Sequence, residues 1–241
     1  MSSIERAKQC IAAARNVAVL TGAGISAESG IPTFRDAQTG LWAKFDPMQL
    51  ASEAGFRADP GTVWRWYAWR RQLVADAQPN AGHRALAAAS RRFDSFELIT
   101  QNVDGLHARA GSDPIELHGN ITRTSCLAQC GFIEDDARRL PAGEPPRCPQ
   151  CGDWLRPAVI WFGEMLDVQT LQRAERAAER SDLMLVIGTS GLVFPAAGLP
   201  LLAARSGAPV IVVNPHASEL DALATLVVRA TAATALPQLL V

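Results

Sequence analysis

The stretch Val17-Ala18-Val19-Leu20-Thr21-Gly22-Ala23-Gly24-Ile25-Ser26-Ala27 decides the fold of this chain of 241 residues. Its first part is an apolar run rich in β-branched side chains, which is typical of a strand buried inside a parallel sheet. Its second part matches G-x-G-x-x-G/A, in which glycines let backbone N–H groups approach a pyrophosphate. On its own this motif is equally typical of a tight strand-to-helix turn without a ligand, so both interpretations stay open here.

Four further apolar runs predict the neighbouring strands of the same sheet. They lie at 96–100, 183–188, 210–214 and 226–228, and stretches rich in Ala, Leu and Arg separate them. This alternation of strands and helices predicts an α/β fold, a doubly wound parallel sheet with helices on both faces. Ser2 followed by Glu5 fits a capping box, which predicts a short amphipathic helix at the start of the chain.

Composition limits the classes of function. With 48% hydrophobic residues, the chain can bury one large core, alone or with a small satellite module. Its 24 acidic residues nearly cancel its 23 basic residues, so nucleic acid and acidic membrane surfaces are not the expected partners. The N-terminus lacks the pattern of a signal peptide, and no apolar run approaches the roughly 20 residues of a membrane span. We therefore expect a cytoplasmic protein.

Four of the five cysteines form two close pairs, Cys126 with Cys130 and Cys148 with Cys151. In a reducing compartment this spacing predicts a zinc ribbon with four thiolate ligands. The first pair has three intervening residues where two are usual. Four buried thiols without metal are the alternative, but in a segment so poor in aliphatic residues one structural zinc ion is the better explanation of an ordered structure. Cys10 is left over, and we expect it to pack on a helix.

The glycine motif is not followed by the features of a hydride-transferring dehydrogenase. Such an enzyme should show a second strand that ends in Asp or Glu about 20 residues later, to hold the adenosine ribose. That part of the sequence instead reads Ser29-Gly30-Ile31-Pro32-Thr33-Phe34-Arg35-Asp36. A loop with an aromatic residue and an ion pair indicates another use of the dinucleotide.

Six motifs together resemble one family closely. GAGIS, GIPTFRD, TQNVDGLH, ELHG, WFGE and GTS occur in this chain in the order seen in sirtuins, and they span nearly its whole length. The resemblance implies one sirtuin catalytic domain over 1–241, a Rossmann-like doubly wound sheet with a small inserted zinc-ribbon module and a helical insertion. The implied parts are an NAD-binding part (17–36, 81–123 and 157–241), a helical insertion with the acyl pocket (37–80) and the zinc-binding module (124–156).

The resemblance also implies which residues hold NAD, the co-substrate that sirtuins consume. From the residues alone, Asn102 and Asp104 could equally form a turn at the end of a strand. By resemblance, Phe34 covers the ribose carbon after nicotinamide leaves, and water is kept from that carbon. The implied cofactor residues are Gly22, Ala23, Gly24, Ser26, Thr33, Phe34, Arg35, Gln101, Asn102, Asp104, Gly188, Thr189, Ser190, Asn214, Pro215, His216 and Ala232.

His118 and Asn102 are the catalytic residues that the resemblance implies. A lone histidine is more often a structural hydrogen bonder, since imidazole suits either role near neutral pH. In the implied mechanism the acyl-lysine oxygen attacks C1′ of NAD, and His118 then acts as general base on the ribose hydroxyls. The implied products are nicotinamide, 2′-O-acyl-ADP-ribose and free lysine.

The substrate peptide has two implied neighbours in the chain. Residues 159–164 are interpreted as an edge strand, which by resemblance pairs with the peptide on one side while residues 191–193 pair on the other. The implied substrate-binding residues of these segments are Val159, Trp161, Phe162, Gly163, Glu164, Gly191, Leu192 and Val193. The expected partners are therefore proteins or peptides with acylated lysine.

Tyr67 and Arg70 share one face of a helical stretch, 62–76, because they are three residues apart. A solvated arginine and an ordinary core tyrosine are the usual interpretation of such a pair. However, Tyr67 is the only tyrosine of the chain, and Y-x-x-R resembles the sirtuin class that removes succinyl, malonyl and glutaryl groups, with acetyl removal as a secondary activity. A guanidinium can bind a carboxylate through two parallel hydrogen bonds while the phenol supplies a third.

The same residues are compatible with two other functions. A mono-ADP-ribosyltransferase would share the cofactor pocket but would need an external nucleophile at C1′. An NAD-responsive binding protein would need no base, and the presence of both His118 and Asn102 is evidence against it.

Overall fold

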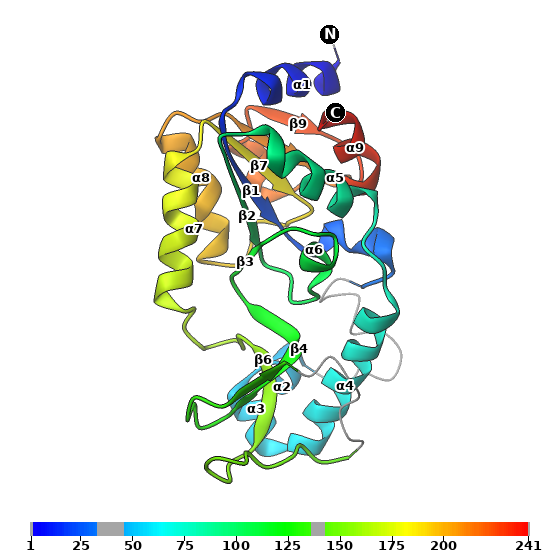
Figure 1. The fold of residues 1–241 in the computed structure, drawn as a ribbon, viewed down its shortest axis with the longest axis vertical. Coiled ribbons are helices and arrows are strands. Elements are labelled where there is room, and N and C mark those ends of the chain that lie inside the picture. Colours follow the sequence, from blue (N-terminus) through cyan, green and yellow to red (C-terminus); the bar gives the residue numbers. More distant parts are fainter. Residues whose placement is uncertain (1, 33–45, 136–142, 241) are drawn as a thin grey trace.

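A parallel sheet of six strands organises the structure, a computed structural model that describes residues 2–32, 46–135 and 143–240 (Figure 1). Its strand order is β3-β2-β1-β7-β8-β9, so the order reverses between β1 and β7. The strands are β1 (Asn16–Thr21), β2 (Ser95–Thr100), β3 (Ile115–Glu116), β7 (Leu183–Ile187), β8 (Val210–Val213) and β9 (Leu226–Val228). All five predicted strands are present, and a reversal of this kind is where open α/β sheets bind ligands.

Helices cover both faces of the sheet because successive side chains of a strand point to opposite sides. Val17 and Val19 pack with α1 (Ser3–Ala13), α5 (Ala81–Ala89) and α9 (Ala232–Leu239). Ala18 and Leu20 pack on the other face with α7 (Val168–Arg180) and α8 (Leu199–Arg205). Figure 1 shows the two layers on either side of β1 and β7. The predicted doubly wound architecture is confirmed.

The first helix begins as the sequence predicts. The backbone N–H of Ser2 donates to the Glu5 carboxylate at 2.7 Å, and the Glu5 N–H donates to the Ser2 hydroxyl at 3.2 Å. Cys10 is partly buried in this helix and packs against the core, as expected for the unpaired cysteine. No helix among the described residues has the length and apolar character needed to cross a membrane.

A second layer of structure lies below the carboxyl ends of the parallel strands in Figure 1. It contains an antiparallel sheet of three strands in the order β5-β4-β6, with β4 (Gly119–Cys126), β5 (Ile133–Asp135) and β6 (Leu155–Val159). Three helices pack beside it: α2 (Pro47–Leu50), α3 (Glu53–Ala58) and α4 (Pro60–Asp76). Phe56, Trp66, Ile121 and Trp161 contribute to the apolar core between the helices and the small sheet.

Arg71 links α4 to the small sheet through hydrogen bonds. Its Nη2 donates to the Arg123 carbonyl at 2.7 Å and to the Thr124 hydroxyl at 2.9 Å, and its Nε donates to the Ile121 carbonyl. Arg71 is only 9% exposed, and guanidinium bonds to buried carbonyls are among the stronger protein hydrogen bonds. The position of α4 relative to β4 is therefore firmly determined.

The predicted edge strand over residues 159–164 is wrong. Strand β6 ends at Val159, and the chain then turns, with the Glu164 N–H donating to the Trp161 carbonyl at 3.0 Å. Gly163 has φ 88°, a left-handed conformation that an extended strand does not contain. The apolar residues Trp161 and Phe162 suggested a strand, but the glycine two residues after Trp161 allows the turn.

Candidate active site

A cleft of about 1320 Å³ lies between the carboxyl ends of the parallel strands and the small sheet. It brings together residues that are far apart in the sequence. Most of the predicted site residues line it: Gly22, Ala23, Gly24, Ser26, Tyr67, Arg70, Gln101, Asn102, Asp104, His118, Val159, Trp161, Phe162, Gly163, Glu164, Gly188, Thr189, Ser190, Leu192, Val193, Asn214, Pro215 and His216.

A few predicted residues are not among those that line the cleft. Gly191 lies beside it, against the side chain of Leu220, and Ala232 is buried at the start of α9. Thr33, Phe34 and Arg35 fall outside the described residues.

The glycine turn after β1 packs directly on the turn after β7. The Gly24 N–H donates to the Gly188 carbonyl at 2.8 Å. A Cβ added to Gly24 would lie 2.8 Å from the Gly188 Cα, which is closer than real Cβ contacts. Only glycine therefore allows the two strand ends to meet at the point where the strand order reverses.

Asn102 and Asp104 follow β2 and face the glycine turn. The Asn102 amide nitrogen donates to the Gly22 carbonyl at 3.1 Å and to the Ser26 hydroxyl at 3.3 Å. Ser26 in turn donates to the Asp104 carboxylate at 2.7 Å. Burial raises the pKa of Asp104, although the hydrogen bonds from Ser26 and Leu106 oppose that rise. These side chains form one connected polar wall of the cleft.

His118 is oriented by a backbone carbonyl. Its Nδ1 lies 2.9 Å from the Gln101 oxygen, and a carbonyl can only accept, so Nδ1 carries the hydrogen and Nε2 keeps a free lone pair. Burial lowers the pKa of His118, so the neutral form is favoured. At the next residue, Gly119 has φ 76°, and an added Cβ would overlap the Ala158 carbonyl of the neighbouring strand. The ring is thus held in the form that can accept a proton.

Tyr67 and Arg70 lie on the same wall of the cleft, as their spacing predicts. The Arg70 guanidinium carbon lies 4.8 Å from the centre of the Trp66 ring and 5.6 Å from that of Tyr67. Burial lowers the pKa of Arg70 and raises that of Tyr67. No ion pair joins Arg70 to a carboxylate in the described part of the chain. A cation that stacks on aromatic rings and has no carboxylate partner is suited to bind an anionic ligand.

Arg156 also supports this wall, although it belongs to none of the sequence motifs. Its guanidinium carbon lies 3.4 Å from the centre of the Trp161 ring. It also binds the Glu164 carboxylate, whose Oε2 accepts from Arg156 at 3.0 Å and from the Trp161 N–H at 2.7 Å. The side chain is 8% exposed. Arg156 was missed because it lies next to the cysteine module, where no motif marks it.

The second half of the sheet supplies the other end of the cleft. The Gln101 amide donates to the Thr189 hydroxyl at 3.0 Å, and the Asn214 amide donates to the Thr189 carbonyl at 3.0 Å. Three strand ends, those of β2, β7 and β8, are therefore tied together by side-chain amides. This arrangement joins the polar wall around Asn102 to the predicted adenosine residues.

Four thiols cluster where the sequence predicts a zinc site. The Sγ atoms of Cys126, Cys130, Cys148 and Cys151 all lie within 4.8 Å of one another. Cys126 and Cys151 are 3.3 Å apart, and Cys130 and Cys148 are 3.6 Å apart. A tetrahedral ion with Zn–S bonds of about 2.3 Å requires sulfur–sulfur distances of about 3.8 Å. The cluster fits one structural zinc ion, with all four positions filled by protein ligands.

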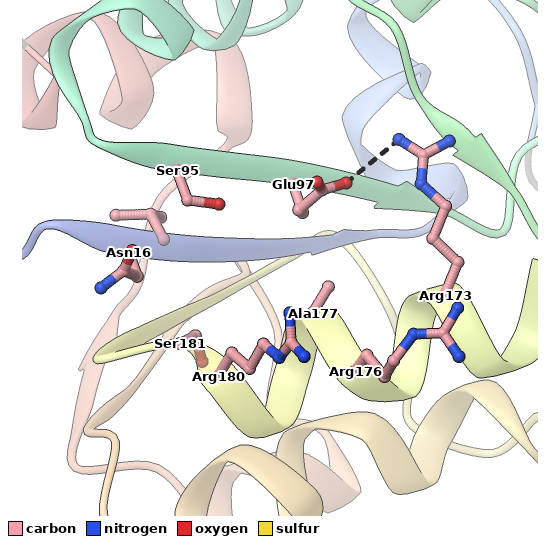
Figure 2. Close-up of a pocket in the computed structure, with 9 residues that line it drawn as sticks. Asn16, Ser95, Glu97, Arg173, Arg176, Ala177, Arg180 and Ser181 are labelled. Atoms are coloured by element: carbon pink, nitrogen blue, oxygen red, sulfur yellow. Dashed lines mark hydrogen bonds and ion pairs between the residues drawn. The ribbon is translucent and has the colours of Figure 1, made fainter.

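A smaller hollow of about 300 Å³ lies at the opposite end of the sheet, beside the amino ends of β1 and β2. Figure 2 shows three arginines of α7 around it, of which Arg173 pairs with Glu97 at 3.2 Å. None of the predicted site residues lines this hollow. The large cleft is therefore the candidate active site.

Comparison with known proteins gives consistent results. Residues 22–195 match the Sir2 family. An NAD-dependent protein deacylase of Ralstonia nicotianae is 55% identical over 236 residues, which cover 98% of this chain and 95% of that protein. A Sir2 homologue solved in complex with NAD superposes with a TM-score of 0.92 at 43% identity, covering 98% of this chain and 92% of the other. A Sir2 structure with a deacetylated p53 peptide and 3′-O-acetyl-ADP-ribose has a TM-score of 0.87 at 33% identity, covering 98% and 96%.

Proposed function

The chain belongs to the Sir2 family and is an NAD-dependent protein deacylase, and from this premise we propose that it prefers lysine acyl groups that end in a carboxylate. The proposed substrates are succinyl-, malonyl- and glutaryl-lysine in proteins or peptides, with acetyl-lysine as a poorer substrate. One observation supports this preference above the others: Arg70 faces the cleft, stacked on two aromatic rings and without a carboxylate partner among the described residues.

We infer a division of the cleft between the two substrates. NAD supplies an electrophilic ribose carbon, C1′, when nicotinamide departs. The glycine turn would lie beside its pyrophosphate, because glycines allow the backbone to approach the phosphates closely. Gln101, Asn102 and Asp104 would hold the nicotinamide side, and Thr189 and Asn214 the adenosine side. Phe34 and Arg35 keep their proposed roles as a cover over the ribose and a cofactor contact.

His118 is the proposed general base. Its Nδ1–H is engaged by the Gln101 carbonyl at 2.9 Å, so Nε2 is free to accept a proton from a ribose hydroxyl. The lowered pKa keeps the ring neutral before it accepts that proton. Such a base allows the ribose 2′-oxygen to take over the acyl group, with nicotinamide, 2′-O-acyl-ADP-ribose and free lysine as products.

The carboxylate preference follows from the charges of the acyl pocket. An acetyl group would leave Arg70 without a direct ion pair among the described residues, with only the more distant charge of Asp104 to favour it, whereas a succinyl carboxylate can accept two parallel hydrogen bonds from it. Tyr67 remains protonated because burial raises its pKa, so its hydroxyl can donate as well. Each charge-assisted hydrogen bond contributes about 1.5 to 3 kcal/mol, which corresponds to roughly ten- to over a hundredfold in specificity.

We propose three further assignments for the same chain. The zinc ion holds residues 124–156 as a module, the insertion 37–80 carries the acyl pocket, and the remaining segments 17–36, 81–123 and 157–241 bind NAD. Strand β6, the turn after it and residues 191–193 would contact the substrate peptide. A four-cysteine zinc site is typical of a reducing compartment, and we therefore propose a cytoplasmic location.

A comparison of two peptides tests the proposed function. The same peptide carrying succinyl-lysine or acetyl-lysine is incubated with the enzyme, with and without NAD, and the products are weighed by mass spectrometry. We expect NAD-dependent loss of both acyl groups and a kcat/KM that favours succinyl by at least tenfold. Faster removal of acetyl would contradict the carboxylate preference, although the enzyme would still be a deacylase.

A further inference from the structure

Two buried histidines that the proposed reaction does not use lie side by side behind the cleft. His83 is on α5 and His107 is on α6 (Leu106–Arg109), and their ring centres are 4.8 Å apart. Both side chains are at most 1% exposed. Nε2 of His83 and Nδ1 of His107 are buried and have no hydrogen-bond partner in the described part of the structure. Buried polar atoms of this kind are rare, because each carries its full desolvation cost.

The contacts of His83 fix which of its nitrogens carries the hydrogen. The backbone N–H of Asn80 donates to Nδ1 of His83 at 3.3 Å. Burial lowers the pKa of His83 to about 4, so the ring is neutral at pH 7. A neutral imidazole has one donor and one acceptor. Because Nδ1 accepts, the unpaired Nε2 of His83 must be the donor.

The contacts of His107 show that its unpaired nitrogen is an acceptor, whereas the unpaired nitrogen of His83 is a donor. Its Nε2 lies 2.9 Å from the Thr21 hydroxyl oxygen, and Thr21 donates its hydroxyl hydrogen to Thr100 at 2.8 Å. A hydroxyl has one hydrogen, so Nε2 of His107 must donate to Thr21. Burial lowers the pKa of His107 to about 3, so this ring is neutral too. Its unpaired Nδ1 is therefore an acceptor.

We propose that Nε2–H of His83 and Nδ1 of His107 are partners, and that this pair closes a polar chain that positions Asn102. At one end, the Asn80 amide donates to the Ile25 carbonyl at 2.7 Å and to the Ser29 hydroxyl at 3.0 Å, just after the glycine turn. At the other end, Thr100 accepts from the backbone N–H of Asn102 at 3.1 Å.

His107 is thus a positioning residue in the middle of this series of hydrogen bonds. Without its Nε2–H, the Thr21 hydroxyl would lose a donor and could turn away from Thr100, which holds the Asn102 backbone. The Asn102 side chain also bonds to the glycine turn, through Gly22 and Ser26. Small displacements of groups that orient a reacting substrate reduce rates strongly. This inference rests on the proposed place of Asn102 in the site and is independent of the acyl preference.

Nuclear magnetic resonance of the histidine rings tests the pairing directly. The chain has four histidines, so ring ¹⁵N labelling of the full-length protein gives four assignable spin systems. We expect neutral Nε2–H tautomers at pH 7 for both His83 and His107, and an Nδ1–H tautomer for His118. An Nδ1–H tautomer at either His83 or His107, or a doubly protonated ring at either, would overturn the proposal.

Kinetics of two His107 variants test the positioning role. His107→Phe should lower kcat about tenfold per folded molecule, with the KM for the peptide changed less than twofold. His107→Gln should recover most of the loss, since its amide can donate to Thr21 and accept from His83. If the phenylalanine variant does not fold, the glutamine variant should still show kcat within threefold of wild type and hold His83 in the Nε2–H tautomer; loss of either overturns the proposal.

The matched control is Leu106→Ala, a buried apolar change in the same short helix. It should lower the melting temperature without changing the tautomers or kcat per folded molecule. If His107→Phe behaves like this control, with a lower melting temperature and kcat within twofold of wild type, the positioning role is wrong. If wild type removes acetyl faster than succinyl while both tautomers are as expected, the error lies in the proposed function and not in the histidine pair.

Discussion

The indole nitrogen of Trp161 donates a hydrogen bond to the hydroxyl oxygen of Tyr67 at 2.9 Å. An indole nitrogen can only donate, so the Tyr67 oxygen is the acceptor and its own hydrogen remains available. Arg70 lies over the face of the same tyrosine ring. The cleft wall therefore presents a guanidinium and a phenolic O–H side by side, and both can donate hydrogen bonds to an anion.

Replacing Arg70 by methionine should reduce the preference for succinyl-lysine. Arg70→Met keeps most of the stem volume but deletes the charge, so desuccinylation should fall by roughly ten- to over a hundredfold, the equivalent of about 1.5 to 3 kcal/mol. Deacetylation should fall much less. The ratio of the two kcat/KM values is the measurement, and an equal loss of both activities would indicate a folding defect and remove the carboxylate-binding role.

Removing either partner of the Tyr67–Trp161 hydrogen bond should act in the same direction with a smaller effect. Tyr67→Phe deletes the donor to the acyl carboxylate, and Trp161→Phe releases the tyrosine hydroxyl from its fixed orientation. One neutral hydrogen bond contributes about 0.5 to 1.5 kcal/mol, so the succinyl-to-acetyl ratio should fall by about two- to twelvefold. A ratio that is unchanged in both variants would show that the phenol does not take part.

His118→Ala should remove deacylation while NAD binding remains. General-base assistance contributes roughly a hundredfold to ten-thousandfold in rate. Because burial lowers the pKa of His118, the acid limb of the kcat/KM profile should lie below pH 6.5, the ordinary value. Turnover within about tenfold of wild type would contradict the role. Calorimetric titration with NAD provides the control for folding.

Cys148→Ser should release zinc and destabilise the protein, because three thiolates leave an open coordination position. Metal analysis of the purified variant and its melting temperature are the measurements. Cys10→Ser is the matched control, since Cys10 lies in α1, outside the thiol cluster, and should keep one zinc per chain. Wild-type protein that contains no zinc and is unaffected by chelators would rule out the metal site.

Acid should destabilise the protein through His83 and His107. In the unfolded chain both rings take up protons near pH 6.5, whereas the folded protein holds their pKa values at about 4 and about 3. The unfolded state therefore binds more protons below pH 6.5, so stability is fully present above that pH and is lost as the pH falls toward 4. Each histidine contributes up to about 1.4 kcal/mol per pH unit in that window.

Urea denaturation at pH 7.5, 6 and 5 measures this loss. The free energy of unfolding of wild type should decrease more steeply with falling pH than that of His107→Gln, which lacks one of the two rings. His216→Gln, at an exposed position, should keep the wild-type slope. Equal slopes in wild type and His107→Gln would show that the buried rings are not the source of acid sensitivity.

The sheet was predictable because each of its strands is recognisable from its own apolar sequence. Val17 to Leu20 is an apolar run followed by Thr21-Gly22, and Val210 to Val213 is one followed by Asn214; buried parallel strands require little more. The cysteine pairs were equally informative, since metal ligands depend on residue type and short spacing. In contrast, the predicted strand after Val159 was wrong, because a run of apolar residues does not distinguish a strand from a turn that buries a tryptophan.

Contacts between distant segments could not be predicted from single residues. Arg156 supports Trp161, and Thr21 joins His107 to Thr100, but neither residue belongs to a motif. The sequence indicated Tyr67 and Arg70 only through their spacing and resemblance. Their orientation depends on Trp161, 94 positions further along the chain. Such relationships arise from packing, which a one-dimensional pattern does not contain.

The bonds from Arg71 to Ile121, Arg123 and Thr124 fix the distance between α4 and β4, and they would set the depth of the proposed acyl pocket. His118 stands directly before the strand to which Arg71 fastens the helix of Arg70. If Arg70 binds the acyl carboxylate as proposed, the distance from the reacting carbonyl to the guanidinium is therefore set by the fold. Malonyl, succinyl and glutaryl groups differ by one methylene each, so a fixed distance should favour the acyl chain whose length matches it. Substitution of Arg71 should weaken that preference for chain length.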